Sequence, residues 1–266
     1  MTPIAWLNRG GFRLAVHGAG ADGPMLVFQH GLCGGSGQMA EAMAGLVGQS
    51  WRGLECPGHG ASPMGGTLTI PAFAQHVIAL IETLDHPVML GGISMGAAIA
   101  SHIAVHRPDL LRGLMLVRPA WVAQDGPANM APNAEVGNLL KRLPRDQARA
   151  VFSQSQTARN LSQMAPDNLA SLVGFFDRAP QDETAELLLA ISSSGPGITR
   201  DDLSAIRMPT LVCGTPKDAI HPQGFAQDLA RLIPGARLVD LPAKADDKAA
   251  HLAALAAAMT QFLQEI

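Results

Sequence analysis

The residues with the clearest chemical potential form the pentapeptide Gly92-Ile93-Ser94-Met95-Gly96, a G-x-S-x-G pattern. It directly follows an expected strand over residues 88–91 and precedes a helical run over residues 97–106. A serine on such a strand-to-helix turn is strained, and small neighbours let its hydroxyl project from the carboxyl end of the sheet. The following helix N-terminus favours the negative charge that develops when a serine attacks a carbonyl. The pattern predicts Ser94 as a nucleophile; the alternative is a capping serine in a glycine-rich turn.

Short apolar runs alternate with longer helical patterns, which is typical of βαβ units on a mostly parallel sheet. The expected strands lie at residues 25–28, 51–55, 88–91, 114–118, 210–213 and 237–241. Apolar residues at helical spacing predict helices around residues 39–47, 73–84 and 252–263. Ahead of the first parallel strand, residues 12–17 and a turn over residues 18–24 predict an antiparallel hairpin at the sheet edge. The fold class is α/β, with helices flanking the sheet.

The regular alternation stops after residue 119 and resumes near residue 208. The intervening segment has no convincing strand, and its helix-like pieces lie at residues 134–143, 146–156, 167–176 and 183–191. A helical insertion at this point would lie beside one end of the sheet. We therefore expect an α/β core made of residues 1–119 and 208–266, with residues 120–207 inserted as a helical subdomain.

Composition excludes several classes of protein. Hydrophobic residues make up 47% of the 266 residues and charged residues only 15%, which is typical of a compact globular chain. The net charge of −3, without a cluster of Lys and Arg, argues against nucleic-acid binding. The most apolar stretch, residues 88–100, is too short to span a bilayer, and the N-terminus lacks an apolar signal segment. We expect a cytoplasmic protein that binds no membrane, either a monomer or a homodimer.

No metal or cofactor is expected. The three cysteines are far apart and in no CxxC spacing, so neither a disulfide framework nor a structural zinc site is indicated. His102 and His106 have helical spacing but lack the Glu of an HExxH motif and a third ligand. Residues 18–23 match G-x-G-x-x-G, but they run into Pro24 and a strand, whereas a dinucleotide-binding loop opens a helix.

Several motifs resemble those of the α/β-hydrolase family, and the resemblance covers nearly the whole chain. Besides the pentapeptide around Ser94, they are Phe28-Gln29-His30-Gly31-Leu32, Cys56-Pro57-Gly58-His59-Gly60-Ala61-Ser62 and Gly214-Thr215-Pro216-Lys217-Asp218. They are similar to the oxyanion loop, the PGHGxS loop and the loop that carries the catalytic acid. Ser94 precedes Asp218 with a helical insertion between them, which is the order this family uses. The resemblance implies an α/β-hydrolase fold in which residues 120–207 form the cap.

Carried over by position, the resemblance implies that Ser94 is the nucleophile and that the backbone N–H groups of Leu32 and Met95 form an oxyanion hole. A serine hydroxyl at its free pKa is a poor nucleophile and needs a base within hydrogen-bond reach. The oxyanion needs preorganised donors. Asp218 would orient the base and stabilise its cation; the alternative for Asp218 is a surface turn.

The base is where the sequence departs from the family pattern. Members usually carry Gly-His just after the last strand, but residues 243–248 contain no histidine. The next histidine is His251, near the start of the final helix, and we assign the base to it; a solvated or capping role is the alternative. His221, three residues after Asp218, is a second candidate for the base. Lys244 is a third, provided that burial lowers its pKa.

Three further residues are candidates for lining the pocket: His30, Cys33 and His221. His30 and His59 lie at positions that the family uses to hold loops together, so their expected role is structural hydrogen bonding. Cys33 follows Leu32, which would make the protein sensitive to thiol reagents without making Cys33 the nucleophile.

The leading hypothesis is a cofactor-independent serine hydrolase that cleaves an ester, thioester or lactone of a small molecule through a Ser94 acyl-enzyme. A second hypothesis, from the missing Gly-His, is a protein of this fold that binds a small ligand without turning it over. A third is a carbon–carbon bond hydrolase or perhydrolase, which the same serine turn can support.

Overall fold

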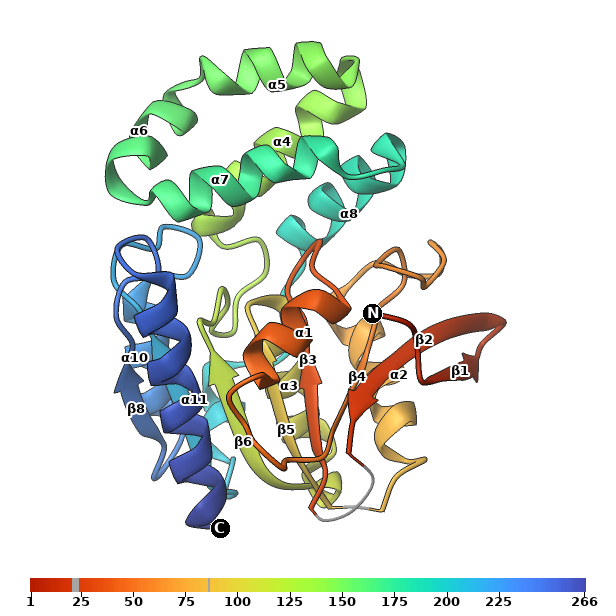
Figure 1. Cartoon of the computed structure of the whole chain (residues 1–266), viewed down its shortest axis with the longest axis vertical. Helices are drawn as coiled ribbons and strands as arrows, with labels where there is room; N and C mark the ends of the chain where they lie inside the picture. Colours follow the sequence, from red (N-terminus) through yellow and green to blue (C-terminus); the bar gives the residue numbers. More distant parts are fainter. Residues whose placement is uncertain (21–23, 86) are drawn as a thin grey trace.

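The computed structural model describes residues 1–20, 24–85 and 87–266. Its strands are β1 Ala5–Arg9, β2 Phe12–Ala19, β3 Leu26–Gln29, β4 Trp51–Leu54, β5 Val88–Ile93, β6 Leu111–Val117, β7 Thr210–Gly214 and β8 Arg237–Asp240. Across the described residues they form one sheet in the order β1-β2-β4-β3-β5-β6-β7-β8 (Figure 1). The pairs from β4 to β8 are parallel, and β1 and β2 add an antiparallel edge. The predicted mostly parallel α/β sheet is confirmed.

Each of the predicted parallel strands is present, as β3 to β8. β3, β5 and β7 are buried along their whole length, as expected of strands covered on both faces. An antiparallel hairpin does lie at the sheet edge, but it joins β1 to β2 through a turn at Gly10 and Gly11, whose φ angles are 58° and 81°. On its other side β2 pairs with β4 and not with β3, so the predicted hairpin into the first parallel strand is wrong. The predicted turn at residues 18–24 includes residues 21–23, which lie outside the described residues.

Helices cover both faces of the sheet. One face carries α2 (Ile70–Ile81), α3 (Met95–His106) and α10 (Gln223–Leu232), and the other carries α1 (Ser36–Met43) and α11 (Lys248–Gln264). The division follows the alternation of side chains along each strand. In β6, Leu114 and Leu116 pack into the first layer, while Met115 and Val117 pack into the second.

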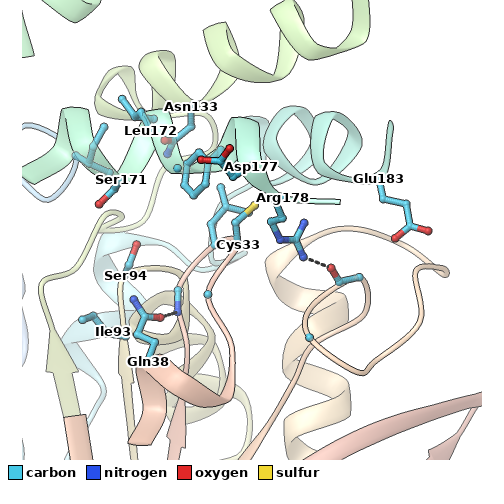
Figure 2. Close-up of a pocket in the computed structure, with 18 of the residues that line it drawn as sticks. Cys33, Gln38, Ile93, Ser94, Asn133, Ser171, Leu172, Asp177, Arg178 and Glu183 are labelled. Atoms are coloured by element: carbon cyan, nitrogen blue, oxygen red, sulfur yellow. Dashed lines mark hydrogen bonds between the residues drawn. The ribbon is translucent and has the colours of Figure 1, made fainter. Parts of the chain in front are cut away.

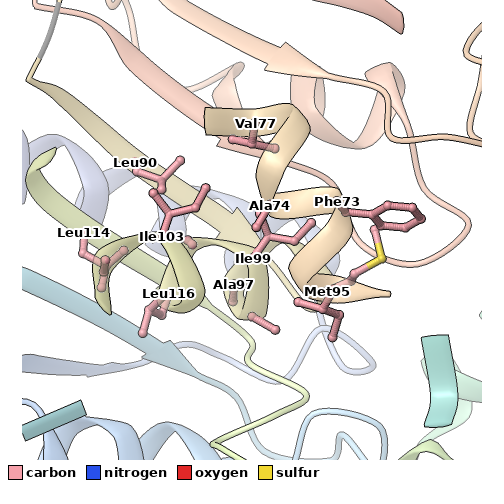
Figure 3. Close-up of a cluster of buried hydrophobic side chains, with 14 of the residues drawn as sticks. Phe73, Ala74, Val77, Leu90, Met95, Ala97, Ile99, Ile103, Leu114 and Leu116 are labelled. Carbon is pink, nitrogen blue, oxygen red and sulfur yellow. The ribbon is translucent and has the colours of Figure 1, made fainter. Parts of the chain in front are cut away.

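The larger core cluster fixes the helix that follows Ser94. Ile99 and Ile103 on α3 lie between Phe73 on α2 and Leu90 on β5 (Figure 3). α2 is itself started by Thr69, whose side-chain oxygen accepts a hydrogen bond from Ala72 N at 3.3 Å. This packing holds the first turn of α3 against the carboxyl end of β5, where the candidate nucleophile lies.

The segment between β6 and β7 is helical, as predicted. It contains α4 Ala131–Arg142, α5 Arg145–Ser153, α6 Gln156–Met164, α7 Pro166–Gly174, α8 Gln181–Ser193 and the short α9 Arg200–Ser204. α4 to α8 form a layer beyond one end of the sheet (Figure 1) and share their own hydrophobic cluster, which includes Phe152, Leu172 and Phe176. α9 instead contacts α3 and α10. The boundaries of the insertion at residues 120 and 207 stay a prediction. The hydrophobic cluster of these helices covers a narrower range, from Val136 to Leu188.

Among the helices of the described residues, none has both the length and the apolar character that crossing a bilayer requires.

Candidate active site

Ser94 occupies the single position between β5 and α3, with φ 58° and ψ −115°. A non-glycine residue in this region of backbone space is strained by about 1–3 kcal/mol and persists only where its surroundings enforce it. The turn leaves Ser94 8% exposed, at the wall of a large cavity.

Two glycines make this turn possible. A Cβ on Gly92 would lie 2.2 Å from the carbonyl of Gly96, and a Cβ on Gly96 would lie 2.2 Å from the carbonyl oxygen of Gln29 on β3. Both obstacles are backbone atoms that cannot rotate away. Glycine at these two positions therefore allows α3 to start directly against β3 and β5.

The backbone N–H groups of Leu32 and Met95 are available near Ser94. Met95 is the first residue of α3, so its N–H has no partner within the helix. The N–H groups on both sides of Leu32 are used: Gly31 donates to Gln38 Oε1 at 2.7 Å and Cys33 donates to His59 Nε2 at 3.0 Å. Within the described residues, the Leu32 N–H has no protein acceptor. The loop is thus fixed on both sides of a free donor.

His30 and His59 fix the loop that contains Leu32 through hydrogen bonds to backbone groups. His30 Nε2 accepts from Cys56 N at 3.1 Å, and its Nδ1 lies 2.8 Å from Gly31 O. Burial lowers the pKa of both imidazoles, so both rings are neutral at neutral pH. Both are fully buried, and neither lines the cavity. This geometry matches the structural role expected for them and gives His30 no contact with the pocket.

Cys33 does line the cavity, next to Leu32, whose backbone N–H is a candidate oxyanion donor. Burial raises the pKa of its thiol to about 11, so the thiolate is scarce at neutral pH. Cys33 is therefore a poor competing nucleophile.

Asp218 and His221 form a hydrogen-bonded carboxylate–imidazole pair at the cavity. Asp218 follows β7 on a loop, and its Oδ1 lies 2.9 Å from His221 Nδ1 and accepts from His221 N, also at 2.9 Å. Arg118, at the end of β6, donates from Nε and Nη2 to Asp218 Oδ2 at 2.9 and 2.5 Å. His221 lines the same cavity as Ser94, while the Asp218 side chain is only 3% exposed behind it.

These contacts set the charges of the pair. Burial by itself would raise the pKa of Asp218, but His221 and Arg118 together hold it well below its usual value, so the carboxylate is ionised. Burial lowers the pKa of His221; Asp218 opposes that shift and Arg118 adds to it. At neutral pH the site therefore contains a carboxylate bonded to a neutral imidazole, which is the form that accepts a proton.

His251 lies elsewhere. It is 2% exposed at the start of α11, its Nδ1 donates to Pro242 O at 2.9 Å, and it does not line the cavity. The structure does not bring His251 together with Asp218. Lys244, the other candidate, does line the cavity, but its Nζ forms an ion pair with Asp167 on α7 at 3.2 Å and makes no contact with Asp218 among the described residues.

The cavity has a volume of about 1020 Å³ and lies between the carboxyl end of the sheet and the inserted helices. Besides Ser94 and His221, its polar lining comprises Gln38, Ser62, Arg118, Asn133, Asn168, Ser171, Asp177, Arg178, Glu183 and Lys244. Figure 2 shows Ser171 on α7 facing Ser94 across the cavity.

Two residues at this site escaped sequence reasoning. Arg118 is the last residue of an expected strand. A charged residue at the carboxyl end of a buried strand could have indicated that it belongs to the site. Asn168 on α7 is 3% exposed, and its Oδ1 accepts from Ala219 N at 2.7 Å and Ile220 N at 3.2 Å. No local sequence pattern predicts these hydrogen bonds, because they join the insertion to a loop that is distant in sequence and carries Asp218 and His221.

Comparison with known proteins gives consistent matches. A family model described as serine aminopeptidase, S33, matches residues 23–251. The pimeloyl-[acyl-carrier protein] methyl ester esterase of Neisseria meningitidis serogroup C is 30% identical over 205 residues, 74% of this chain and 74% of that protein. The putative carbamate hydrolase RutD of Pseudomonas savastanoi pv. phaseolicola is 27% identical over 227 residues, 82% of this chain and 85% of that protein. The enol-lactonase of Burkholderia xenovorans LB400 has a similar structure, with TM-score 0.74 and 22% identity over 97% of this chain and 99% of that one.

Proposed function

The chain belongs to the α/β-hydrolase family, and we propose that it is a cofactor-independent serine hydrolase that cleaves a carboxylic ester or lactone of a small molecule. Ser94 is the nucleophile, and His221, rather than the predicted His251, is the base. The observation that carries this proposal is the Asp218–His221 pair, whose imidazole lines the same cavity as Ser94. His221 takes the role that the Gly-His histidine has in the family pattern and that the sequence alone assigned to His251.

The proton path follows from the contacts of His221. Its Nδ1–H donates to Asp218, which leaves Nε2 as the acceptor. As Ser94 Oγ bonds to the carbonyl carbon, its proton passes to His221 Nε2, and the ionised Asp218 stabilises the imidazolium.

The tetrahedral intermediate carries its negative charge on the former carbonyl oxygen. The N–H groups of Leu32 and Met95 are the proposed donors to it, and a donor of this kind contributes about 2.7–4 kcal/mol. When the intermediate collapses, the bond to the alcohol oxygen breaks, and His221 returns its proton to that oxygen. Water, activated by the same base, then hydrolyses the Ser94 acyl-enzyme and regenerates the serine.

The substrate class follows from the cavity and the relatives. A cavity of about 1020 Å³ suits a small molecule. The similar proteins are named as a methyl ester esterase, a carbamate hydrolase and an enol-lactonase, and esters, carbamates and lactones are all hydrolysed at a carbonyl carbon. We assign the inserted helices α4 to α8 the role of a cap over this cavity, because residues of α4, α7 and α8 line it.

Covalent labelling tests the proposal. The protein is treated with a fluorophosphonate probe, and adducts are counted by intact mass in the wild type, Ser94→Ala and Ser171→Ala. We expect one adduct on the wild type and on Ser171→Ala, whose hydroxyl lines the same cavity, and none on Ser94→Ala. Turnover of p-nitrophenyl esters should follow the same pattern. Ligand-induced thermal stabilisation without a Ser94 adduct or turnover would favour the non-catalytic binding protein instead.

A further inference from the structure

The cations that line the cavity differ in what neutralises them. Arg118 is paired with Asp218, and Lys244 is paired with Asp167. Arg178 donates only to neutral acceptors: to Gly58 O and, at 3.3 Å, to Thr184 Oγ1. In the part of the chain that the structure describes, it forms no ion pair. Its positive charge is therefore uncompensated by a protein carboxylate.

The position of Arg178 makes this charge accessible to a ligand. Arg178 follows η3 (Phe175–Asp177) in the insertion, lines the cavity and reaches the core loop at Gly58 (Figure 2). In that view it lies beyond Cys33 from Ser94, so the guanidinium is remote from the nucleophile. Its two hydrogen bonds fix the group and leave most of its N–H donors free.

The charge also acts on neighbouring groups. Burial is the main cause of the lowered pKa values of His30 and His59, and Arg178 lowers both further. At Cys33 the same charge opposes the rise that burial causes in the pKa. The field of Arg178 thus reaches Cys33 in the cavity wall and the two buried imidazoles of His30 and His59.

From these observations we propose that Arg178 is a specificity-determining residue that binds a carboxylate on the substrate, at the end of the molecule remote from the ester bond. This inference rests on the proposed function. A fixed guanidinium fork matches the two oxygens of a carboxylate, and a charge-assisted bond of this kind is stronger than one between neutral groups. The preferred substrates are therefore esters whose acyl part ends in a carboxylate.

Two carboxylates line the same cavity: Asp177 is paired with Arg149, and Glu183 forms no ion pair within the described residues. Glu183 lies in the first turn of α8, where the helix N-terminus favours a carboxylate, and it forms no ion pair with Arg178. Its negative charge should weaken the binding of an anionic substrate. Replacing Glu183 therefore provides a variant whose effect has the opposite sign to that of replacing Arg178.

The experiment compares p-nitrophenyl hydrogen adipate, which is anionic, with p-nitrophenyl hexanoate, which has a neutral acyl chain of the same length. The readout is the ratio of the two kcat/KM values, because a general loss of folding or of catalysis changes both values together. We expect Arg178→Gln to lower this ratio about 10- to 100-fold, the range of a charge-assisted hydrogen bond. Arg178→Lys, which keeps the charge but not the fork, should fall between the wild type and Arg178→Gln.

Two matched variants complete the design. Glu183→Gln should raise the ratio, and Arg142→Gln, which removes an exposed cation of α4 outside the cavity, should leave it unchanged. A ratio that is the same in Arg178→Gln and the wild type would overturn the inference while leaving the proposed function standing. Absence of Ser94-dependent turnover of both esters would instead overturn the proposed function. In that case thermal stabilisation by adipate decides the inference: it should be present in the wild type and lost in Arg178→Gln, and equal stabilisation would contradict it.

Discussion

Arg118 donates two hydrogen bonds to a single oxygen of Asp218, Oδ2, from Nε at 2.9 Å and from Nη2 at 2.5 Å. The other oxygen, Oδ1, accepts from the backbone N–H of His221 at 2.9 Å, and the His221 ring Nδ1 lies 2.9 Å from Oδ1 and 3.0 Å from Oδ2. The carboxylate is thereby shared between a permanent cation and the candidate base. Arg118 fixes the orientation of the acid and opposes protonation of the imidazole beside it.

The first prediction separates the two candidate histidines. We expect His221→Gln to lower kcat for p-nitrophenyl esters by a factor of about 10²–10⁴, because general-base catalysis is lost. His251→Gln should have a small effect on kcat, since a glutamine amide can still donate to Pro242 O. Steady-state kinetics of both variants, with melting temperatures to confirm folding, provide the measurement. The opposite pattern would restore the base to His251.

The second prediction concerns pH. The pKa of His221 lies below its ordinary value of 6.5, chiefly because the ring is buried. The neutral ring is the active form, so kcat/KM should be at its plateau at neutral pH and fall only below pH 6.5. Removing the positive charge in Arg118→Gln raises the pKa of His221, so the acid limb should move to higher pH. Profiles of kcat/KM against pH for the wild type and Arg118→Gln test the direction of this pKa shift. An acid limb that moves to lower pH in Arg118→Gln would contradict the prediction.

The third prediction tests the contact between the insertion and the catalytic loop. Asn168→Ala leaves the buried N–H of Ile220 and the half-buried N–H of Ala219 without their acceptor, which costs about 1–3 kcal/mol of unfolding free energy. Because these residues lie between Asp218 and His221, kcat should fall as well. Urea unfolding and ester kinetics are the measurements. Asn138→Ala, which removes an exposed amide that bonds only within α4, is the control and should be near neutral.

The fourth prediction compares two glycines. Gly96→Ala forces a Cβ to within 2.2 Å of the Gln29 carbonyl oxygen and should destabilise the protein by about 1–3 kcal/mol or more. Gly37 in α1 has open space around its Cβ position, so Gly37→Ala should stabilise the protein by up to about 1 kcal/mol through helix propensity. Thermal melts of both variants distinguish them; equal melting temperatures would show that the serine turn tolerates a side chain.

The sequence predicted the parallel part of the sheet because those strands are short and rich in apolar residues, and β3, β5 and β7 are buried along their whole length. β1 escaped prediction because it is a mostly exposed edge strand, whose only large aromatic, Trp6, is 38% exposed. α6 escaped for a similar reason: Ala158 and Leu161 are its only buried residues, too few to show a helical period. A helix or strand that buries few side chains shows little hydrophobic periodicity in its sequence, so sequence patterns do not predict it.

The candidate site divides in the same way. The neighbourhood of Ser94 is local, so five consecutive residues were sufficient to predict a strained turn. The choice of base depends on which way Asp218 faces, and that is set by Arg118, distant in sequence, and by Asn168 in the insertion. Position along the sequence favoured His251, the first histidine after the last strand, whereas the contacts of Asp218 favour His221.

The bond from Asn168 to the catalytic loop also limits how the protein can be re-engineered. Exchanging the helices of the insertion for those of another family member is an obvious route to new substrates. In this chain such a chimera would lose the acceptor for the backbone N–H groups of Ala219 and Ile220, beside His221. A successful graft must therefore carry an asparagine at the position of Asn168, or exchange residues 218–221 together with the helices as one module.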